Sequence, residues 1–236
     1  MSIQAILFDL DGTLLPMDQD VFAGSYFKAL CKCYASLGYP VEPFMEGVKT
    51  GIAAMVKNDG SRTNEEAFWA KLIACLGEKA WQDKPHLDEF YRTDFQALQS
   101  VCGYAPEAAE ILSFLKKAGK TVVLATNPLF PSDATESRVR WAGLNKADLS
   151  LITSYENIGY SKPNPRYYRE IADRLRLAPE ECLMVGNDVR EDMIAEQIGM
   201  KVFLLTDCLI NKDELPIDRY PNGDFAVLRR YLETVI

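Results

Sequence analysis

Two aspartates, Asp9 and Asp11, directly follow a short apolar run over residues 4–8 and precede Gly12 and Thr13. Because they are two residues apart, extended backbone places both side chains on the same side. Two close carboxylates repel each other, and a hard divalent cation relieves that repulsion. A set of oxygen ligands suits Mg²⁺ better than zinc or copper. The pair therefore predicts an acidic site that binds Mg²⁺.

Polar side chains also follow three later apolar runs of the chain. They are Thr126 and Asn127 at the end of residues 121–126, Lys162 after residues 149–154, and Asn187, Asp188 and Asp192 after residues 182–186. In open α/β sheets, ligands bind at the carboxyl ends of the strands. A lysine supplies a point charge for phosphate, and hydroxyl or amide donors bind the remaining phosphate oxygens. Together with Asp9 as a nucleophile, this set fits phosphoryl transfer.

Each of these later residues has a simpler interpretation when it is taken alone. Thr126 and Asn127 could cap the next helix, and an isolated lysine such as Lys162 is usually a surface residue. Asp188 and Asp192 could both lie at a helix N-terminus, where the helix dipole stabilises acids. The functional interpretation rests on the order of the four segments and on their place after strands.

The pattern of apolar residues predicts the elements that position these side chains. The runs that predict buried strands are residues 4–8, 121–126, 149–154, 182–186 and 201–205. The segments with helical spacing after residue 100 are 106–119, 132–142, 165–177, 191–198 and 224–234. Alternating helices and strands predict a parallel sheet with helices on both faces.

Residues 17–98 lack this alternation and are predicted to be helical throughout. The expected helices are residues 19–37, 43–56, 63–76 and 86–98, the third opened by a capping box of Thr63 and Glu66. The fold class is therefore α/β, with a Rossmann-like core and an inserted all-helical domain. We expect residues 1–16 and 99–236 to form the core and residues 17–98 to form the insertion.

Composition excludes several classes of protein. The 236 residues are 48% hydrophobic, which is enough for a buried core, and they carry a formal net charge of −8. That charge argues against a nucleic-acid partner, which requires a basic face, and against an anionic membrane surface. The single histidine excludes most histidine-based metal sites.

The start of the chain lacks a basic segment and its apolar run is interrupted by Asp9, so no signal peptide is expected. No stretch approaches the roughly 20 apolar residues of a membrane span. We therefore expect a cytoplasmic protein whose six cysteines are reduced. These cysteines are Cys31, Cys33, Cys75, Cys102, Cys182 and Cys208.

The four segments together resemble the four ordered motifs of the haloacid dehalogenase (HAD) superfamily. They are DLDGT at residues 9–13, Thr126 with Asn127, Lys162 in SKPNP, and GND at 186–188 with Asp192. The resemblance implies a Rossmann-like core and a C1-type cap, which is a helical domain inserted after the first motif. It covers nearly the whole chain.

The resemblance also implies a role for each matching residue. Asp9 would be the nucleophile that forms an aspartyl-phosphate, and Asp11 would be the general acid and base. Thr126 and Lys162 would hold the transferring phosphoryl group, and Asn127 would position the substrate or a phosphate oxygen. Mg²⁺ would bind the Asp9 carboxylate, the main-chain carbonyl of Asp11 and an acid of the fourth motif.

One position departs from the family pattern. The family commonly has an acid directly after the glycine of the fourth motif, whereas this chain has Asn187 there and Asp188 next. We expect Asp188 to be the metal ligand through a shifted turn. The alternative is that Asn187 binds through its amide oxygen, and in both cases Asp192 would support the site.

The function expected from the sequence is a Mg²⁺-dependent phosphatase acting on a small phosphorylated metabolite. A dehalogenase typically lacks the second aspartate, so Asp11 argues against it. A phosphonatase would need a Schiff-base lysine from the insertion, for which Lys28, Lys49 and Lys57 are available. A phosphomutase and a non-catalytic HAD-like binding protein stay open. The sequence identifies neither the substrate nor whether the protein is a monomer or a homodimer.

Overall fold

The computed structural model describes residues 2–236, which contain one six-stranded sheet. All strands are parallel, and their order across the sheet is β3-β2-β1-β4-β5-β6. The strands are β1 (Ala5–Phe8), β2 (Thr121–Leu124), β3 (Leu151–Ile152), β4 (Cys182–Gly186), β5 (Lys201–Leu205) and β6 (Asn222–Gly223). This arrangement confirms the predicted α/β fold class.

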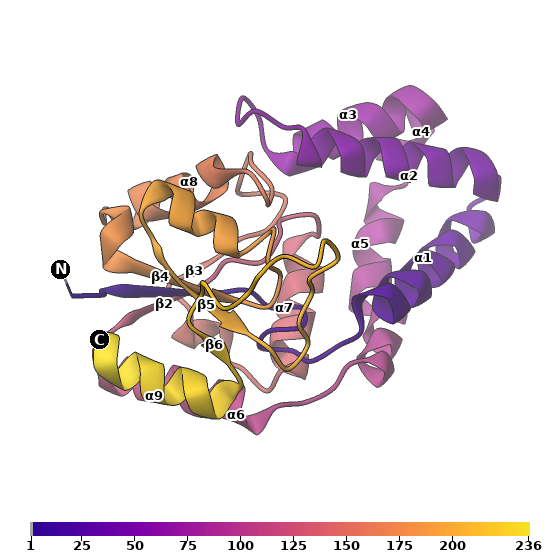
Figure 1. The fold of residues 1–236 in the computed structure, drawn as a ribbon. Helices are drawn as coiled ribbons and strands as arrows, with labels where there is room; N and C mark the ends of the chain where they lie inside the picture. The colour runs from indigo at the N-terminus through magenta and orange to yellow at the C-terminus, as the bar shows by residue number, and fades with distance from the viewer. Residues whose placement is uncertain (1) are drawn as a thin grey trace.

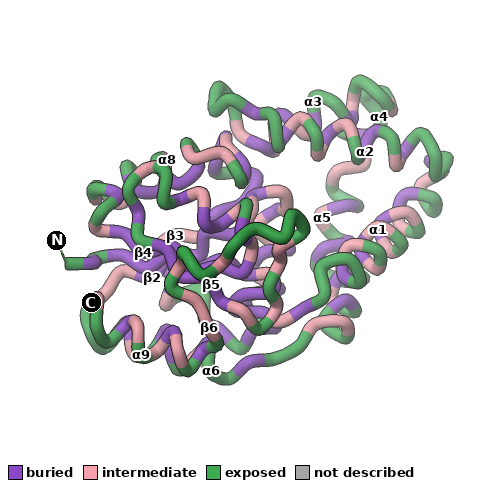
Figure 2. Tube along the Cα trace, in the orientation of Figure 1, coloured by how far each residue is buried: buried purple, intermediate pink, exposed green. Residues whose placement is uncertain are grey.

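The sheet is covered on both faces because every central strand is apolar on both sides. Successive side chains of β1 point to opposite faces: Ile6 and Phe8 enter one core cluster, and Ala5 and Leu7 enter the other. The helices that cover the first face are α6 (Pro106–Lys117), α7 (Ser132–Trp141) and α9 (Phe225–Val235). The second face is covered by α8 (Pro165–Leu175) and the 3₁₀ helix η4 (Met193–Ile198). Figure 2 shows the central strands β1 and β4 buried and the outer faces of the helices exposed.

Residues 19–101 form a separate group of helices, named here the helical layer. Its elements are α1 (Gln19–Ser36), α2 (Val41–Val56), α3 (Asn64–Leu76), α4 (Lys79–Gln82), α5 (Lys84–Arg92) and the 3₁₀ helix η1 (Asp94–Val101). Figure 1 shows this layer beyond the end of the sheet toward which β1 runs from the N-terminus. The helical layer therefore lies over the carboxyl ends of the strands, where the candidate catalytic and binding residues are expected.

Local sequence signals set several element boundaries as predicted. Thr63 and Glu66 form the capping box that begins α3, and Asn164 caps α8, whose first residue is Pro165. Gly77, with a φ of +82°, ends α3.

The structure differs from the predicted elements where the chain changes its backbone geometry. The helix expected over 86–98 ends at Arg92, because Thr93 (φ −117°, ψ −90°) leaves the helical region, and η1 follows. The strand expected over 149–154 has only two paired residues, and the Asn157 side chain accepts a hydrogen bond from the Ser154 main chain just beyond them. The helix expected over 191–198 is the shorter η4. Strand β6 was not predicted, and α4 lies within the predicted helical segment but between the individual helices expected there.

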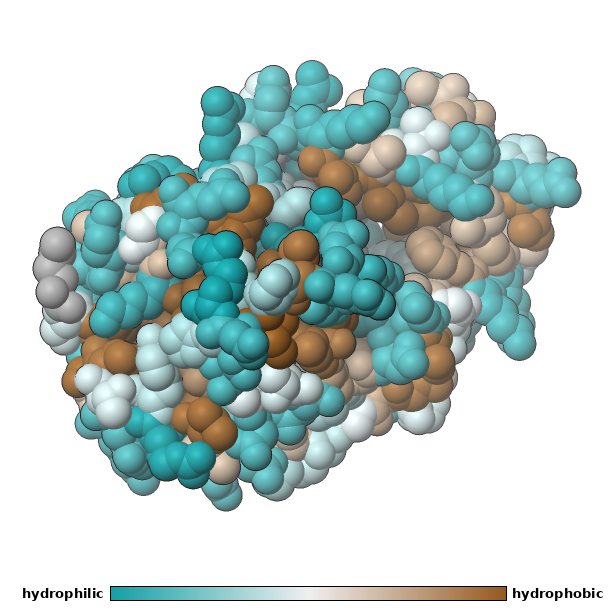
Figure 3. All heavy atoms as spheres, viewed as in Figure 1, coloured by the Kyte–Doolittle hydropathy of each residue, from teal (hydrophilic) through white to brown (hydrophobic). Residues whose placement is uncertain are grey.

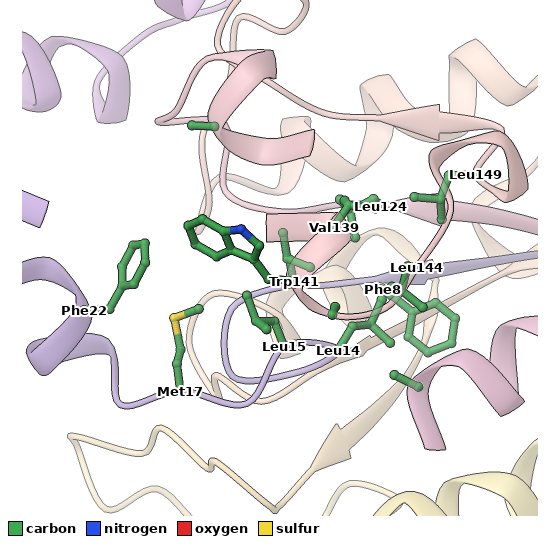
Figure 4. Close-up of a cluster of buried hydrophobic side chains, with 14 of the residues drawn as sticks. Phe8, Leu14, Leu15, Met17, Phe22, Leu124, Val139, Trp141, Leu144 and Leu149 are labelled. Atoms are coloured by element: carbon green, nitrogen blue, oxygen red, sulfur yellow. The ribbon is translucent and has the colours of Figure 1, made fainter. Parts of the chain in front are cut away.

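An aromatic cluster joins the helical layer to the sheet core. Phe22 and Phe95 of the helical layer contact Phe130 and Trp141, with ring centroids of Phe95 and Trp141 5.2 Å apart. Figure 4 shows that Phe22 lies at one end of a buried cluster that continues through Trp141 to Phe8 beside the sheet. The two parts thus share one hydrophobic core.

A buried asparagine provides a second, polar connection. Asn64 is fully buried at the start of α3, and its amide nitrogen donates to the Pro128 carbonyl (3.1 Å) and to Ser161 Oγ (3.0 Å). Its amide oxygen accepts a hydrogen bond from Asn58. Because Ser161 precedes Lys162, this contact fixes the segment that carries the lysine relative to the helical layer.

No helix among residues 2–236 combines the length and the apolar character needed to cross a lipid bilayer.

Candidate active site

The structure brings all four predicted segments together at the carboxyl ends of β1, β2 and β4 and at the segment before α8. Their side chains are mostly withdrawn from solvent, and only Asp11, Asn127 and Asp188 are half-buried. The buried ones are Asp9, Thr126, Lys162, Asn187 and Asp192. Lys162 is 1% exposed, which excludes the interpretation of a surface lysine.

The Lys162 ammonium group lies between two carboxylates. Its Nζ is 2.8 Å from Asp9 Oδ1 and 2.6 Å from Asp192 Oδ1. Burial lowers the pKa of Lys162, but Asp192 and Asp9 outweigh that effect and hold it well above its usual value. Burial raises the pKa of Asp9 to about 7 against the opposing charge of Lys162, with Asp192 adding to the increase. The single positive charge of Lys162 therefore neutralises only part of the negative charge of Asp9 and Asp192.

The second oxygen of Asp9 contacts Thr13, which follows it in the DLDGT segment. Thr13 Oγ1 lies 3.2 Å from Asp9 Oδ2 and 2.9 Å from Asn187 Oδ1. The turn between them requires Gly12, because its φ is +86° and a Cβ would lie 2.3 Å from the Asn187 amide nitrogen. The amide oxygen of Asn187 thus faces the Asp9 region, and its nitrogen donates to the Cys208 carbonyl (2.6 Å).

Asp188 makes different contacts from Asn187. Its Oδ1 accepts hydrogen bonds from the main-chain nitrogens of Arg190 (2.7 Å) and Glu191 (2.9 Å), so this oxygen stabilises its own turn. Its main-chain nitrogen donates to Asp192 Oδ2 at 3.0 Å. Burial raises the pKa of the Asp188 carboxyl.

Asp11 pairs with an arginine that was not anticipated from the sequence. Arg138 of α7 is fully buried, forms a salt bridge to Asp11 Oδ2, and lies 4.3 Å above the centre of the Phe130 ring. The other carboxylate oxygen, Asp11 Oδ1, is buried and has no hydrogen-bond partner among the residues described. The only sequence pattern that points to Arg138 is its spacing. It lies on the same face of α7 as Ala134 and Trp141, both of which are buried.

Thr126 and Asn127 are tied into the site in different ways. The Thr126 carbonyl accepts hydrogen bonds from Thr153 and from the Tyr167 hydroxyl, each 2.8 Å long. The Asn127 side chain accepts from the Lys162 main chain (3.3 Å) and donates to Glu191 (3.0 Å). Asn127 therefore links the segments of Lys162 and Glu191, and Glu191 is a second charged residue that the sequence did not indicate.

The donor atoms fit a hard cation, although no three Asp, Glu, His or Cys side chains in residues 2–236 converge as a metal site. The candidate oxygen ligands come instead from mixed sources: the Asp9 carboxylate, the Asp11 carbonyl and the Asn187 amide, whose oxygen and Asp9 Oδ2 both contact the Thr13 hydroxyl. The Asp11 carbonyl accepts a hydrogen bond from Gln19 (3.0 Å). Mg²⁺ requires only one or two protein carboxylates and keeps several waters. An oxygen set of this kind is compatible with Mg²⁺.

A cavity of about 330 Å³ opens beside these residues, between the helical layer and the sheet. Its floor includes Asp9, Asp11, Thr126 and Asn127, and its wall comes mainly from α1, α2, α3 and α5. Cavities of this size hold small molecules. The arrangement therefore offers a buried carboxylate nucleophile, an adjacent lysine and room for a substrate.

Comparison with known proteins gives consistent matches over most of the chain. The model of the haloacid dehalogenase-like hydrolase family matches residues 3–198. A phosphoglycolate phosphatase of Neisseria gonorrhoeae is 30% identical over 198 residues, which cover 82% of this chain and 75% of that protein. The pyrophosphatase PpaX of Bacillus mycoides is 24% identical over 85% of this chain and 82% of its own. The magnesium-bound structure of the HAD-hydrolase YfnB from Bacillus subtilis superimposes with a TM-score of 0.57 at 18% identity, covering 99% of this chain and 100% of that one.

The buried Arg138–Asp11 pair yields a prediction about stability. Replacing Arg138 with Ala leaves the Asp11 carboxylate without its partner, and we expect the free energy of unfolding to fall by about 3–5 kcal/mol. The exposed Arg140 on the same helix is the matched control, and Arg140→Ala should change the value by less than about 0.5 kcal/mol. Urea denaturation followed by circular dichroism measures both.

A double-mutant cycle separates the ion pair from the packing of Arg138 on Phe130. The loss in Arg138→Ala/Asp11→Asn should be smaller than the sum of the two single losses by about 1–3 kcal/mol. Strict additivity would show that Arg138 stabilises the protein through packing alone.

Proposed function

The chain belongs to the haloacid dehalogenase-like hydrolases, and we propose that it is a Mg²⁺-dependent phosphatase that works through an aspartyl-phosphate on Asp9. The observation that carries this proposal is the position of the Asp9 carboxylate. It lies at the end of β1 between Lys162 Nζ and Thr13 Oγ1, and it lines the cavity together with Asp11. A nucleophile, a fixed cation and a second acid are thus within one site, as phosphoryl transfer requires.

The chemical steps follow from these positions. Asp9 attacks phosphorus, and the bond from phosphorus to the leaving-group oxygen breaks. Asp11 gives its proton to that oxygen and then removes a proton from a water that attacks phosphorus. The bond between phosphorus and the Asp9 oxygen breaks in this second step, which restores the Asp9 carboxylate and releases inorganic phosphate. Lys162 offsets the charge of the phosphoryl oxygens, and Thr126 donates a hydrogen bond to one of them.

Arg138 is a positioning residue in this scheme. It binds one oxygen of Asp11, which fixes the carboxyl group at the cavity wall. The other oxygen, Oδ1, is buried and has no hydrogen-bond partner among the described residues, so we assign the proton transfer to this oxygen.

The charge balance supports the requirement for Mg²⁺. With every acid ionised, the site carries five acids against two bases, a formal net charge of −3, before a phosphate dianion arrives. The acids are Asp9, Asp11, Asp188, Glu191 and Asp192, and the bases are Arg138 and Lys162. Asp9, the Asp11 carbonyl and Asn187 would hold Mg²⁺, with Asp192 supporting the site through Lys162 and the Asp188 main chain. When bound, the ion would neutralise phosphoryl charge.

We also propose that residues 17–98 act as the cap of this enzyme and that residues 1–16 and 99–236 form its catalytic core. The helical layer supplies most of the cavity wall, so a substrate in contact with Asp9 would also contact the cap. A phosphonatase is disfavoured, because Lys28, Lys49 and Lys57 are exposed and do not line the cavity.

The first test is the loss of the nucleophile. Asp9→Asn keeps the size of the side chain but removes its nucleophilic charge, so Mg²⁺-dependent hydrolysis of p-nitrophenyl phosphate should fall by at least about 10³-fold. Chelation by EDTA should abolish activity of the unchanged protein, and added Mg²⁺ should restore it. Circular dichroism confirms that the variant is folded. Activity that survives both treatments would contradict the proposal.

The second test decides which residue of the fourth motif binds the ion. The contacts of Asn187 with Thr13, and those of Asp188 with its own turn, favour Asn187. We expect Asn187→Ala to weaken Mg²⁺ binding by about 10-fold or more and Asn187→Asp, which adds a negative charge, to strengthen it. Asp188→Asn, which keeps the acceptor of the turn, should change the affinity by less than about twofold.

Isothermal titration calorimetry with Mg²⁺ alone measures these affinities without reference to activity. A large loss in Asp188→Asn together with a small effect in Asn187→Ala would assign the ligand to Asp188 instead.

A further inference from the structure

The wall of the cavity opposite the acidic residues is apolar. Fourteen of the 23 residues that line the cavity are aliphatic or aromatic, and nine of the ten contributed by the helical layer are of this type. The apolar wall residues from α1, α2 and α3 include Phe22, Tyr26, Phe27, Val48, Ile52 and Phe68. Figure 3 shows hydrophobic surface on the helical side of the hollow between the two parts.

Several of these side chains are incompletely buried. Phe27, Ile52 and Phe68 are only half-buried, although each packs on the main hydrophobic cluster. Phe68 lies directly against Gly51 of α2, where a Cβ would come within 2.6 Å of its ring. The apolar surface left open in the cavity is therefore available to a ligand.

The cavity offers no positive charge to a leaving group. None of its lining residues is Lys, Arg or His in the part of the chain that the structure describes, and all its charged lining residues are acids. Arg138 and Lys162 both lie below the cavity in ion pairs. A carboxylate or a second phosphate on the leaving group would have to lose its hydration without gaining a counter-charge.

The cavity wall also offers few free polar atoms. The hydroxyl groups of Tyr26 and Tyr91 are hydrogen-bonded to each other at 2.7 Å, and the Gln19 amide donates to the Asp11 carbonyl. A leaving group with many hydroxyls, such as a sugar, would lose hydrogen bonds to water there, and the wall would replace few of them.

We propose that the enzyme prefers phosphomonoesters whose leaving alcohol is uncharged and carries an aromatic or bulky aliphatic group. This inference rests on the proposed phosphatase function and names its substrate class. The proposed substrate class differs from the compounds for which two relatives are named, phosphoglycolate and pyrophosphate, because both of those compounds carry a second anionic group.

The test compares primary alkyl phosphates that differ in the group beyond the reacting oxygen. With Mg²⁺ present, kcat/KM should be roughly 10²-fold higher for 2-phenylethyl phosphate than for 2-phosphoglycolate or ethyl phosphate. Most of the difference from ethyl phosphate should be in KM, because the ring contacts the wall before and during the reaction. p-Nitrophenyl phosphate, whose good leaving group makes the chemical step easier, reports only whether the protein is catalytically competent.

A charge placed on the wall should reverse this preference. Ile52→Lys puts an ammonium group into the cavity, and we expect 2-phosphoglycolate to gain and 2-phenylethyl phosphate to lose at least about 10-fold in kcat/KM. Ala53→Lys, at the exposed neighbouring position of α2, is the matched control and should behave as the unchanged protein. If Ile52→Lys fails to fold, the comparison of esters on the unchanged protein still decides the question.

The outcomes separate the two proposals. Equal or better hydrolysis of 2-phosphoglycolate, or no gain from the phenyl ring over ethyl phosphate, would overturn the substrate class while the phosphatase function stands. Failure to hydrolyse any of the esters, p-nitrophenyl phosphate included, would overturn the phosphatase function and the substrate class with it.

Discussion

The buried ammonium group of Lys162 is the interaction on which the site depends. A lysine that is 1% exposed is stable as a cation only when carboxylates surround it. Asp9 and Asp192 meet that need, and they arrive from the ends of β1 and from the segment after β4. Since Lys162 itself lies before α8, one charge fixes three segments that are distant in the sequence. The order of the strands, with β1 between β2 and β4, makes this convergence possible.

A second series of contacts connects Asp11 to the helical layer. Phe22 and Tyr26 of α1 contact Phe130, the ring of Phe130 lies under the Arg138 guanidinium, and Arg138 binds Asp11. The position of the proposed general acid is thus set by residues that also form the junction between the two parts. Asn64 makes the equivalent connection on the other side, to the segment that carries Lys162.

Much of this organisation was predictable because it depends on local patterns. The strands β1, β2, β4 and β5 are short apolar runs that end in polar residues, and a parallel sheet necessarily gathers those ends. The capping box at Thr63 and Pro165 at the start of α8 fixed helix starts for reasons contained in a few neighbouring residues. The roles of Asp9 and Lys162 remain predictions, but their proximity follows from the fold.

The unpredicted features depend on contacts between distant segments. The two-residue strand β6 exists only because β5 offers an edge to pair with, and no pattern in Asn222–Gly223 indicates a strand. Arg138 looks like any helical arginine until Asp11, 127 residues away, supplies its partner. The orientations of Asn187 and Asp188 likewise depend on Thr13 and on the turn at Arg190, which adjacency in the sequence does not determine.

The separation of the cavity into an acidic floor and an apolar wall has one further consequence. Asp9 and Lys162 are buried at the floor and the apolar wall offers few free polar groups to screen them, so the attraction between Lys162 and Asp9 and the mutual repulsion of the acids both become stronger. An unbalanced net charge of −3 would then oppose a phosphate dianion far more than it would at an open surface. The apolar wall and the proposed need for a divalent cation are therefore linked, because the burial that favours an apolar leaving group also makes uncompensated carboxylates costly.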